Sequence, residues 1–217
     1  MPILCHLSQL VQRSAERYGD RTALQYRDYT QGRWVPISWN RFARRVEQTS
    51  RSLIALGVGV QDNVAVFSQN KPESLFVEFG AFSVRSVLIP FYATSSGAQV
   101  QYMVNDAKIR VVFVGEQQQY DVVWSVMSLC HCLEHIVIFD RTVQRNEADH
   151  LSIYFDEFLR LGDADSAYLA QMHVRNGEAK DEDVANILYT SGTTGQPKGV
   201  LLLHSQYRFA IEAHTKV

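Results

Sequence analysis

Hydroxyl side chains, a proline and a lysine are concentrated near the end of the 217-residue chain, in the stretch YTSGTTGQPKGV, residues 189–200. Hydroxyl groups can rotate to donate hydrogen bonds to phosphate oxygens. Lys198 adds a full positive charge on a long stem, and Pro197 restricts the backbone immediately before it. The hydroxyls belong to Thr190, Ser191, Thr193 and Thr194. This combination predicts a loop that binds a polyphosphate.

Three glycines in the same stretch, Gly192, Gly195 and Gly199, support this interpretation. Glycine adopts a positive φ without strain and lets the backbone approach a ligand closely. Consecutive N–H groups in such a turn converge on one point, which attracts an anion. We therefore expect main-chain and side-chain donors to surround the phosphates together.

Two other interpretations of the loop fit less well. The Walker motif needs a glycine where Pro197 stands and a hydroxyl residue where Gly199 stands. An ordinary hairpin loop with a solvated lysine also contains Ser, Thr and Gly, because these residues favour turns. The density of ligand-type residues between two apolar runs favours the phosphate-binding loop.

Apolar runs of strand length alternate with segments of helical periodicity upstream of the loop. Continuous apolar strands joined by helices are typical of a parallel sheet that is covered on both sides. The sequence therefore predicts an α/β fold, with a mostly parallel sheet and helices on both faces. Strands are expected at 63–68, 86–90, 110–115, 135–140, 184–190 and 199–204, and helices at 7–18, 39–56, after Pro72, after 94–96 and at 117–127.

Turn and capping residues delimit several of these elements. Gly32 separates two strand-like runs within residues 22–39, which predicts a hairpin. Ser38 and Ser205 are expected to cap the helices that follow them. Pro72 is of the residue type that suits the first turn of a helix.

Polarity divides the chain into three parts. Residues 1–162 form a βα-rich subdomain, residues 163–183 are a polar connection, and residues 184–217 hold the two loop strands and a final helix. Because the chain stops within this last helix, we expect an N-terminal fragment of a larger domain.

The stretch YTSGTTGQPKGV closely resembles the phosphate-binding motif of the adenylate-forming superfamily, which includes acyl-CoA synthetases, luciferases and the adenylation domains of peptide synthetases. Residues 62–115 are similar to the early region of the same family, with NKPE at a helix start and VLIPFYATS along and after a strand. In detail they look most like bacterial long-chain fatty-acid CoA ligases. The resemblance covers nearly the whole chain and implies part of the large N-terminal AMP-binding domain.

The resemblance implies an AMP-forming ligase that activates a long-chain fatty acid with ATP as an acyl-adenylate and then transfers the acyl group to coenzyme A. It implies that Thr190 also lies near the Mg²⁺ that accompanies ATP. The family's catalytic lysine, with its adenine, acyl and coenzyme A contacts, is expected beyond Val217, so the 217 residues alone are expected to be inactive. The residues that the resemblance assigns to the ATP phosphates are Thr190, Ser191, Gly192, Thr193, Thr194, Gly195 and Lys198.

Two alternative functions stay open. One is an acyl-adenylate ligase that loads a carrier protein, and the other is a non-catalytic nucleotide-binding module, if the natural chain ends near Val217. Fatty acid and coenzyme A are the expected partners, as substrates. A homodimer and a peripheral membrane contact are left open.

Composition restricts the class of protein further. The net charge is −2, so no overall positive field draws the chain to nucleic acid, and no nucleic-acid partner is expected. No apolar run approaches the roughly 20 residues that span a bilayer, and the start lacks the pattern of a secretory signal. Cys5, Cys130 and Cys132 are too few for a disulfide framework. A cytoplasmic location is expected.

Two weaker patterns have ordinary interpretations. CHCLEH, residues 130–135, contains four potential zinc ligands, Cys130, His131, Cys132 and His135, but no second ligand pair lies nearby and buried reduced cysteines are favoured. His204 follows the second loop strand and could lie near the nucleotide. A hydrogen-bonded histidine at a strand end is the interpretation that we favour, and we assign it no catalytic role.

The predicted helix 39–56 is strongly basic. Its arginines are Arg41, Arg44, Arg45 and Arg51, against the single acid Glu47. They face away from the apolar stripe of the helix, which is typical of a solvated outer face. Contact with membrane lipid is the alternative, since a long-chain fatty acid would arrive from a membrane.

Overall fold

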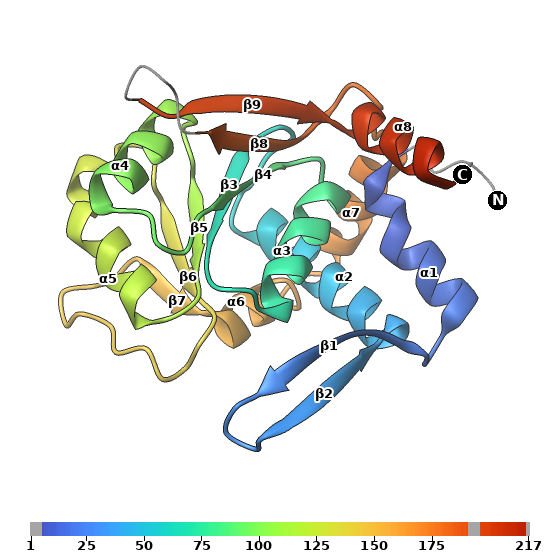
Figure 1. Ribbon diagram of the computed structural model, residues 1–217, viewed down its shortest axis with the longest axis horizontal. Helices are drawn as coiled ribbons and strands as arrows, with labels where there is room; N and C mark the ends of the chain where they lie inside the picture. Colours follow the sequence, from blue (N-terminus) through green and yellow to red (C-terminus); the bar gives the residue numbers. More distant parts are fainter. Residues whose placement is uncertain (1–5, 191–195, 216–217) are drawn as a thin grey trace.

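The computed structural model describes residues 6–190 and 196–215. Its centre is a seven-stranded sheet with the order β7-β6-β5-β3-β4-β8-β9 (Figure 1). Neighbouring strands are parallel except for β8 and β9, which pair antiparallel. The strands are β3 (Asn63–Phe67), β4 (Val87–Phe91), β5 (Val111–Val114), β6 (His135–Ile138), β7 (Ser152–Tyr154), β8 (Val184–Thr190) and β9 (Lys198–Leu203).

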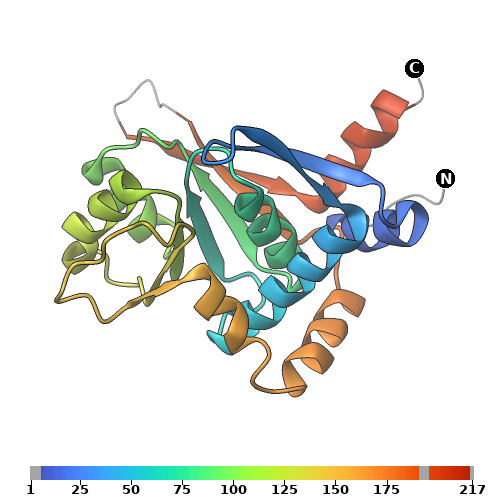
Figure 2. The same cartoon turned by 90° about the horizontal axis from the view of Figure 1, so that it is seen from below.

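Helices cover both faces of this sheet, as Figures 1 and 2 show. One core contains apolar residues of α1 (Leu10–Tyr18), α2 (Trp39–Ala55), α3 (Pro72–Ser83), α6 (Phe155–Leu161) and α7 (Ala167–Gly177). The other core contains apolar residues of α4 (Gly97–Asp106) and α5 (Gln117–Val126). Short 3-10 turns, Leu7–Gln9 and Met127–Leu129, precede α1 and follow α5. The predicted α/β fold, mostly parallel and covered on both faces, is confirmed.

Local residue chemistry accounts for the helix starts. The Ser38 hydroxyl accepts a hydrogen bond from the Arg41 backbone N–H at 3.3 Å, so the predicted cap of α2 is confirmed. Pro72 lies in the first turn of α3, where its missing N–H costs no helical hydrogen bond. Ser96 and Gln99 form a reciprocal capping box at the start of α4.

A hairpin that is separate from the main sheet follows α1. It consists of β1 (Thr22–Asp28) and β2 (Arg33–Ser38), paired antiparallel, and thus confirms the predicted turn around Gly32. Its inner face contributes the buried Ile37 and the partly buried Leu24 to the core that contains α2. The hairpin projects at the foot of the molecule in Figure 1.

The structure differs from the sequence expectation in the later part of the chain. Residues 163–183, expected as a polar connection, contain the helix α7, and β7 and α6 were not anticipated. The expectation for residues 163–183 missed an apolar stripe within the polar segment, of which Met172 is buried and Leu169 packs against the same core.

The last helix, α8 (His204–Thr215), begins one residue earlier than expected. Ser205 lies inside it, so the predicted cap at Ser205 is wrong. The Ser205 backbone N–H donates instead to the Asp181 carbonyl at 2.9 Å, and the Gln206 side chain accepts from the Leu203 N–H at 2.7 Å. Within residues 6–190 and 196–215, no helix is both long and apolar enough to cross a bilayer.

Candidate functional site

The two ends of the predicted phosphate-binding loop lie directly opposite each other. β8 ends at Thr190, β9 begins at Lys198, and these two residues are cross-strand partners. Opposed residues of an antiparallel pair project from the same face, with their Cβ atoms about 5 Å apart. Both residues are exposed. A hydroxyl and an ammonium group therefore stand side by side at the mouth of the loop.

The remaining residues assigned to the phosphates fall outside the part of the chain that the structure describes. They are Ser191, Gly192, Thr193, Thr194 and Gly195. Their proposed contacts stay predictions, whereas the positions of Thr190 and Lys198 at the two strand ends are structural findings.

The mouth of the loop lies at the carboxyl edge of the parallel strands. Thr190 ends β8 in the direction in which β3, β4, β5 and β6 also end. Ligands of open α/β sheets bind at this edge, near points where successive helices leave to opposite faces. The helices α3 and α5, which follow the neighbouring strands β3 and β5, do belong to opposite faces. The location thus suits a nucleotide.

The charge of Lys198 is available at this edge. Among the described residues it forms no salt bridge, whereas Lys71 at the same edge pairs with Glu116 at 3.1 Å and with Asp140 at 3.6 Å. Lys71 thus links the residues that follow three strands, whereas Lys198 has no carboxylate partner in the part of the chain that the structure describes.

Gly199 allows β9 to lie close to β8, and this role differs from the expected one. A Cβ atom at Gly199 would lie 2.8 Å from Ile187 Cγ2 and 3.4 Å from Tyr189 Cζ. Gly199 is part of a regular strand and is not among the residues with positive φ. The sequence expectation of a left-handed backbone at Gly199 is therefore wrong, because the constraint comes from side-chain packing.

Tyr189 anchors the strand that leads into the loop. Its hydroxyl donates a 2.5 Å hydrogen bond to Asp106 Oδ2 at the end of α4. Burial of the ring and the neighbouring Asp106 carboxylate raise the pKa of Tyr189, so the phenol stays protonated and keeps donating. Sequence reasoning missed this contact, since nothing local links residues that lie 83 positions apart.

His204 lies at the far end of β9, and this position separates it from the loop. Six residue steps along a strand amount to roughly 20 Å. The ring is buried, with its centroid 3.5 Å from that of His6, and burial lowers the pKa of His204 to about 3. His204 is thus a packed, neutral histidine, and the view that it lies near the nucleotide is not supported.

The CHCLEH stretch contains no metal site in the described ranges. Cys130 is buried and Cys132 is partly buried, and both are free thiols. No group of three or more His, Cys, Asp or Glu side chains among the described residues could hold a metal ion. Glu134 is engaged by the Arg110 guanidinium, with Nη2 and Oε2 2.6 Å apart.

Comparison with known proteins places this geometry in a family. The fold is shared with the anthranilate CoA ligase AuaEII, solved with anthranoyl-AMP, with a TM-score of 0.79 at 20% identity, covering 98% of this chain and 37% of that one. The model of the AMP-binding enzyme family matches residues 11–216. The chain belongs to the AMP-binding enzyme family, and the recognised resemblance to adenylate-forming enzymes is confirmed.

Curated relatives carry a more specific name. The human long-chain-fatty-acid–CoA ligase ACSBG2 is 26% identical over 212 residues, 97% of this chain and 31% of the relative. Long chain acyl-CoA synthetase 3 of Arabidopsis thaliana is 28% identical over 191 residues, 86% of this chain and 28% of the relative. The chain thus spans about a third of the length of the curated relatives it matches.

Proposed function

We propose that this chain is the N-terminal part of an AMP-forming ligase, which activates a long-chain fatty acid with ATP and passes the acyl group to coenzyme A. The observation that most directly supports this proposal is the pairing of Thr190 and Lys198 at the carboxyl edge of the sheet. The exposed Lys198 ammonium forms no salt bridge with another described residue there. The names of the curated relatives support the substrate class.

The physical difficulty of the first step is electrostatic. An anionic carboxylate has to approach the α-phosphate of an anionic triphosphate. A positive charge and hydroxyl donors on the β- and γ-phosphates reduce this repulsion and stabilise the charge on departing pyrophosphate. We assign this task to Lys198, Thr190 and the loop residues Ser191–Gly195 between them.

Thr190 is also the residue that we propose to lie near Mg²⁺. A threonine hydroxyl is a neutral oxygen ligand of the kind that Mg²⁺ accepts beside phosphate oxygens. The exposed position of Thr190 beside Lys198 fits a metal ion that enters together with the triphosphate.

The first test removes the ammonium group in the full-length protein. Lys198→Ala should slow adenylation about tenfold to a hundredfold, since a charge-assisted hydrogen bond contributes roughly 1.5–3 kcal/mol. If the contact tightens as pyrophosphate leaves, ATP binding should weaken less than the rate falls. Fatty-acid-dependent pyrophosphate release and calorimetric ATP binding measure the two effects.

Lys180→Ala is the matched control, because Lys180 is exposed and its ammonium forms no salt bridge or hydrogen bond with another described residue. It should behave as wild type. An equal loss of rate and ATP affinity in Lys198→Ala would indicate uniform ground-state binding. Wild-type behaviour of Lys198→Ala in both assays would contradict the proposed site.

A second test concerns the 217 residues alone. We expect no pyrophosphate release with palmitate and ATP above that of the same piece carrying Lys198→Ala. The reason is that the chain spans about a third of the length of the curated relatives it matches, and we propose that the catalytic lysine and the acyl and coenzyme A contacts implied by the family resemblance belong to the remaining part. Release well above this control would refute the expectation.

The thiol acceptor distinguishes the proposed ligase from its alternatives. The intact protein is given short, medium, long and aromatic acids with ATP, and either coenzyme A or a carrier protein as acceptor. Thioester formation with coenzyme A and a long-chain acid supports the proposal. Transfer only to the carrier protein, or nucleotide binding with no transfer, would replace it.

A further inference from the structure

Positive charge is concentrated in one segment of the chain. Residues 21–55 contain seven arginines and two acidic residues, a net charge of +5, although the whole chain carries −2. This segment comprises the β1–β2 hairpin and α2, which are consecutive in sequence and in contact. Such an asymmetry attracts anions locally even when the whole molecule is slightly acidic.

Most of this charge is not neutralised by neighbouring carboxylates. Of the seven arginines, only Arg51 forms a salt bridge with another described residue, Asp163. Of the nine arginines elsewhere in the described chain, five pair with carboxylates, namely Arg85, Arg110, Arg141, Arg160 and Arg208.

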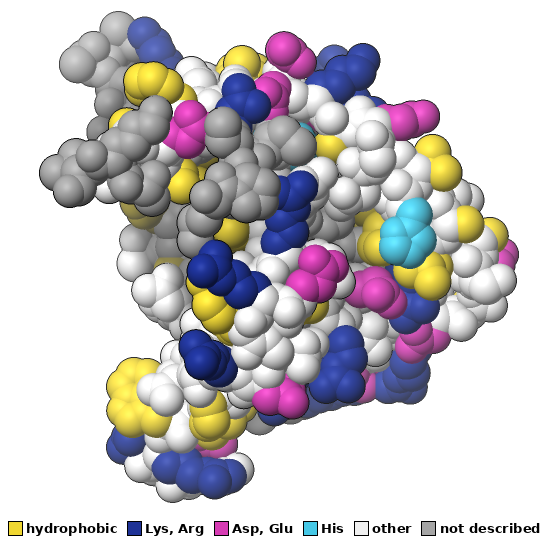
Figure 3. Space-filling model, turned by 90° about the vertical axis from the view of Figure 1, so that its right-hand side faces the viewer, with side chains coloured by type: hydrophobic (Ala, Val, Ile, Leu, Met, Phe, Trp, Pro, Cys, Tyr) yellow, Lys and Arg dark blue, Asp and Glu magenta, His cyan; other side chains and the backbone are white. Residues whose placement is uncertain are grey.

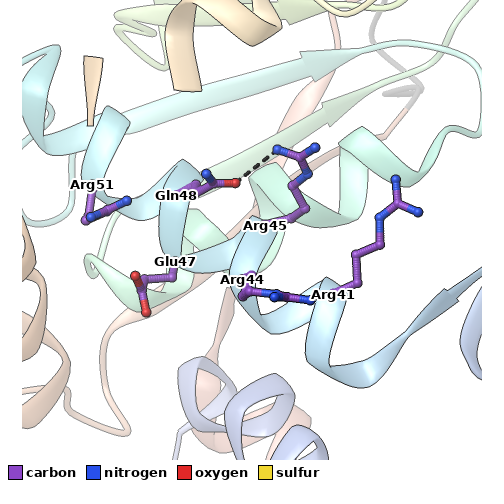
Figure 4. A pocket seen from close by; sticks show the side chains of 6 residues that line it. All are labelled: Arg41, Arg44, Arg45, Glu47, Gln48 and Arg51. Atoms are coloured by element: carbon purple, nitrogen blue, oxygen red, sulfur yellow. Dashed lines mark hydrogen bonds between the residues drawn. The ribbon is translucent and has the colours of Figure 1, made fainter. Parts of the chain in front are cut away.

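The arginines of α2 lie along one side of the helix. Figure 4 shows their side chains beside Gln48 and Glu47, where together they line a shallow hollow of about 370 Å³. Arg45 donates to the Gln48 side-chain oxygen at 3.0 Å, while Arg41 and Arg44 are exposed. The opposite side of α2 is buried in the core, so the arginine side faces outward, as the sequence pattern indicated.

The hairpin adds exposed aromatic rings to this basic surface. Tyr29 in the turn is 89% exposed and Trp34 at the start of β2 is 60% exposed. Trp34 lies directly opposite Arg27, and Gln25 and Pro36 continue the same outward face. Figure 3 shows apolar and basic side chains together on the projecting hairpin, and Figure 2 shows the hairpin and α2 on the same side of the molecule.

We propose that the hairpin tip and the arginine side of α2 form a docking surface for an anionic phospholipid bilayer. Tryptophan and tyrosine rings prefer the boundary between lipid head groups and acyl chains. Arginines bind head-group phosphates and are attracted by the negative potential of anionic lipid. The rings lie at the hairpin tip with Arg27 beside Trp34, and the arginines of α2 follow the base of the hairpin, so the surface follows this layering.

The order of rings and charges favours a bilayer over other anionic partners. Single-stranded nucleic acid binds best to several aromatic platforms along a basic groove, whereas here both rings lie at one protruding end. The proposal does not depend on the ligase reaction, although a surface on the membrane would receive a fatty acid directly. Its test therefore measures binding rather than turnover.

The experiment is co-sedimentation of the full-length protein with vesicles of phosphatidylcholine, either alone or with 30% phosphatidylglycerol. We expect binding to anionic vesicles to be at least tenfold tighter than to neutral ones, and to weaken when salt rises from 0.1 to 0.5 M. Tyr29→Ser with Trp34→Ser, and separately Arg41→Gln with Arg44→Gln, should each reduce binding at least tenfold.

Lys108→Gln with Lys180→Gln is the matched control, since it removes two exposed charges outside the surface and should leave binding unchanged. The melting temperature of each variant checks folding, and a blue shift of fluorescence that is lost in Trp34→Phe reports insertion of that ring. Equal binding to neutral and anionic vesicles, or wild-type binding by both double variants, would overturn the proposal. So would dimerisation without lipid that depends on Trp34, or tighter binding to single-stranded DNA than to vesicles.

Discussion

At the scale of single residues, Gly199 determines how closely the two loop strands approach. It lies opposite Tyr189, one position from the pair formed by Thr190 and Lys198. A side chain at Gly199 would push against Ile187 on the facing strand. The separation of the hydroxyl and the ammonium at the loop mouth therefore depends on the absence of a methyl group next to them.

Replacing Gly199 by alanine tests this contact. In a strand with free space around this position, the change would raise the free energy of unfolding slightly, because glycine loses more conformational entropy on folding than alanine does. With Ile187 Cγ2 2.8 Å away, we expect a loss of about 1–3 kcal/mol in the free energy of unfolding, measured by urea titration.

Two further variants decide the cause of that loss. Gly177→Ala, where no atom lies within 4 Å of the added methyl, should not destabilise the protein. In the double mutant, Ile187→Ala should reduce the loss of stability that Gly199→Ala causes, because it removes the Ile187 atom nearest to the added methyl group. A Gly199→Ala protein as stable as wild type would show that the strands adjust freely.

At the scale of secondary-structure elements, side chains support the attachment of β8 to the parallel strands. Its pairing with β4 is recorded at only one register position, Leu88 opposite Asn186. The buried Asn186 amide donates to the Leu88 carbonyl at 3.2 Å and accepts from the Tyr207 hydroxyl at 2.8 Å. Asn186 thus joins β4, β8 and α8, and holds in place the strand that ends at Thr190.

Asn186→Ala should loosen this end of the sheet selectively. Loss of two hydrogen bonds and the burial of unpaired groups should lower stability by roughly 2–3 kcal/mol. Amide hydrogen exchange should accelerate in β8 and β9 more than in β3 and β5. Asn105→Ala is the control, because it also removes two hydrogen bonds, one donated to the Leu129 carbonyl and one accepted from the His131 N–H, and it should leave exchange in β8 and β9 unchanged. A uniform acceleration across the sheet would contradict the anchoring role.

The same elements show which features a sequence can predict. Apolar runs predicted β3–β6 and β8 because strands buried in a mostly parallel sheet are apolar along their length. This pattern is visible in the sequence without knowing which strands pair. The stretch TSGTTGQPKG predicted a phosphate-binding loop from local chemistry. The structure describes the two strand ends that flank it, Thr190 and Lys198, and the phosphate contacts stay a prediction. By contrast, the Asn186 and Tyr189 contacts depend on residues distant in the chain, and α7 has only a narrow apolar stripe within a polar segment.

At the scale of the whole molecule, one polar cluster joins four parts of the chain at the end of β8 and β9 that is remote from Thr190 and Lys198. Arg85, after α3, donates to both oxygens of Asp183, which immediately precedes β8. His6 from the N-terminal segment lies 3.8 Å from the same carboxylate and stacks on His204, the first residue of α8. Asp183 remains charged because the Arg85 guanidinium and backbone donors outweigh burial, so its pKa is lowered.

This cluster should make the protein sensitive to mild acid. Burial lowers the pKa of His204 to about 3 and also lowers that of His6, despite the nearby Asp183 and Asp181. The unfolded chain binds these protons near pH 6.5 and the folded chain does not. The contribution of His204 is therefore fully present above pH 6.5 and declines as the pH falls toward 3, by up to about 1.4 kcal/mol per pH unit, and His6 adds to the decline in the same direction. Urea titrations between pH 7 and 5 should show this slope, and His204→Phe should reduce it, while the exposed-site control His173→Phe should not. Parallel pH profiles for wild type and His204→Phe would mean that the acid sensitivity originates elsewhere.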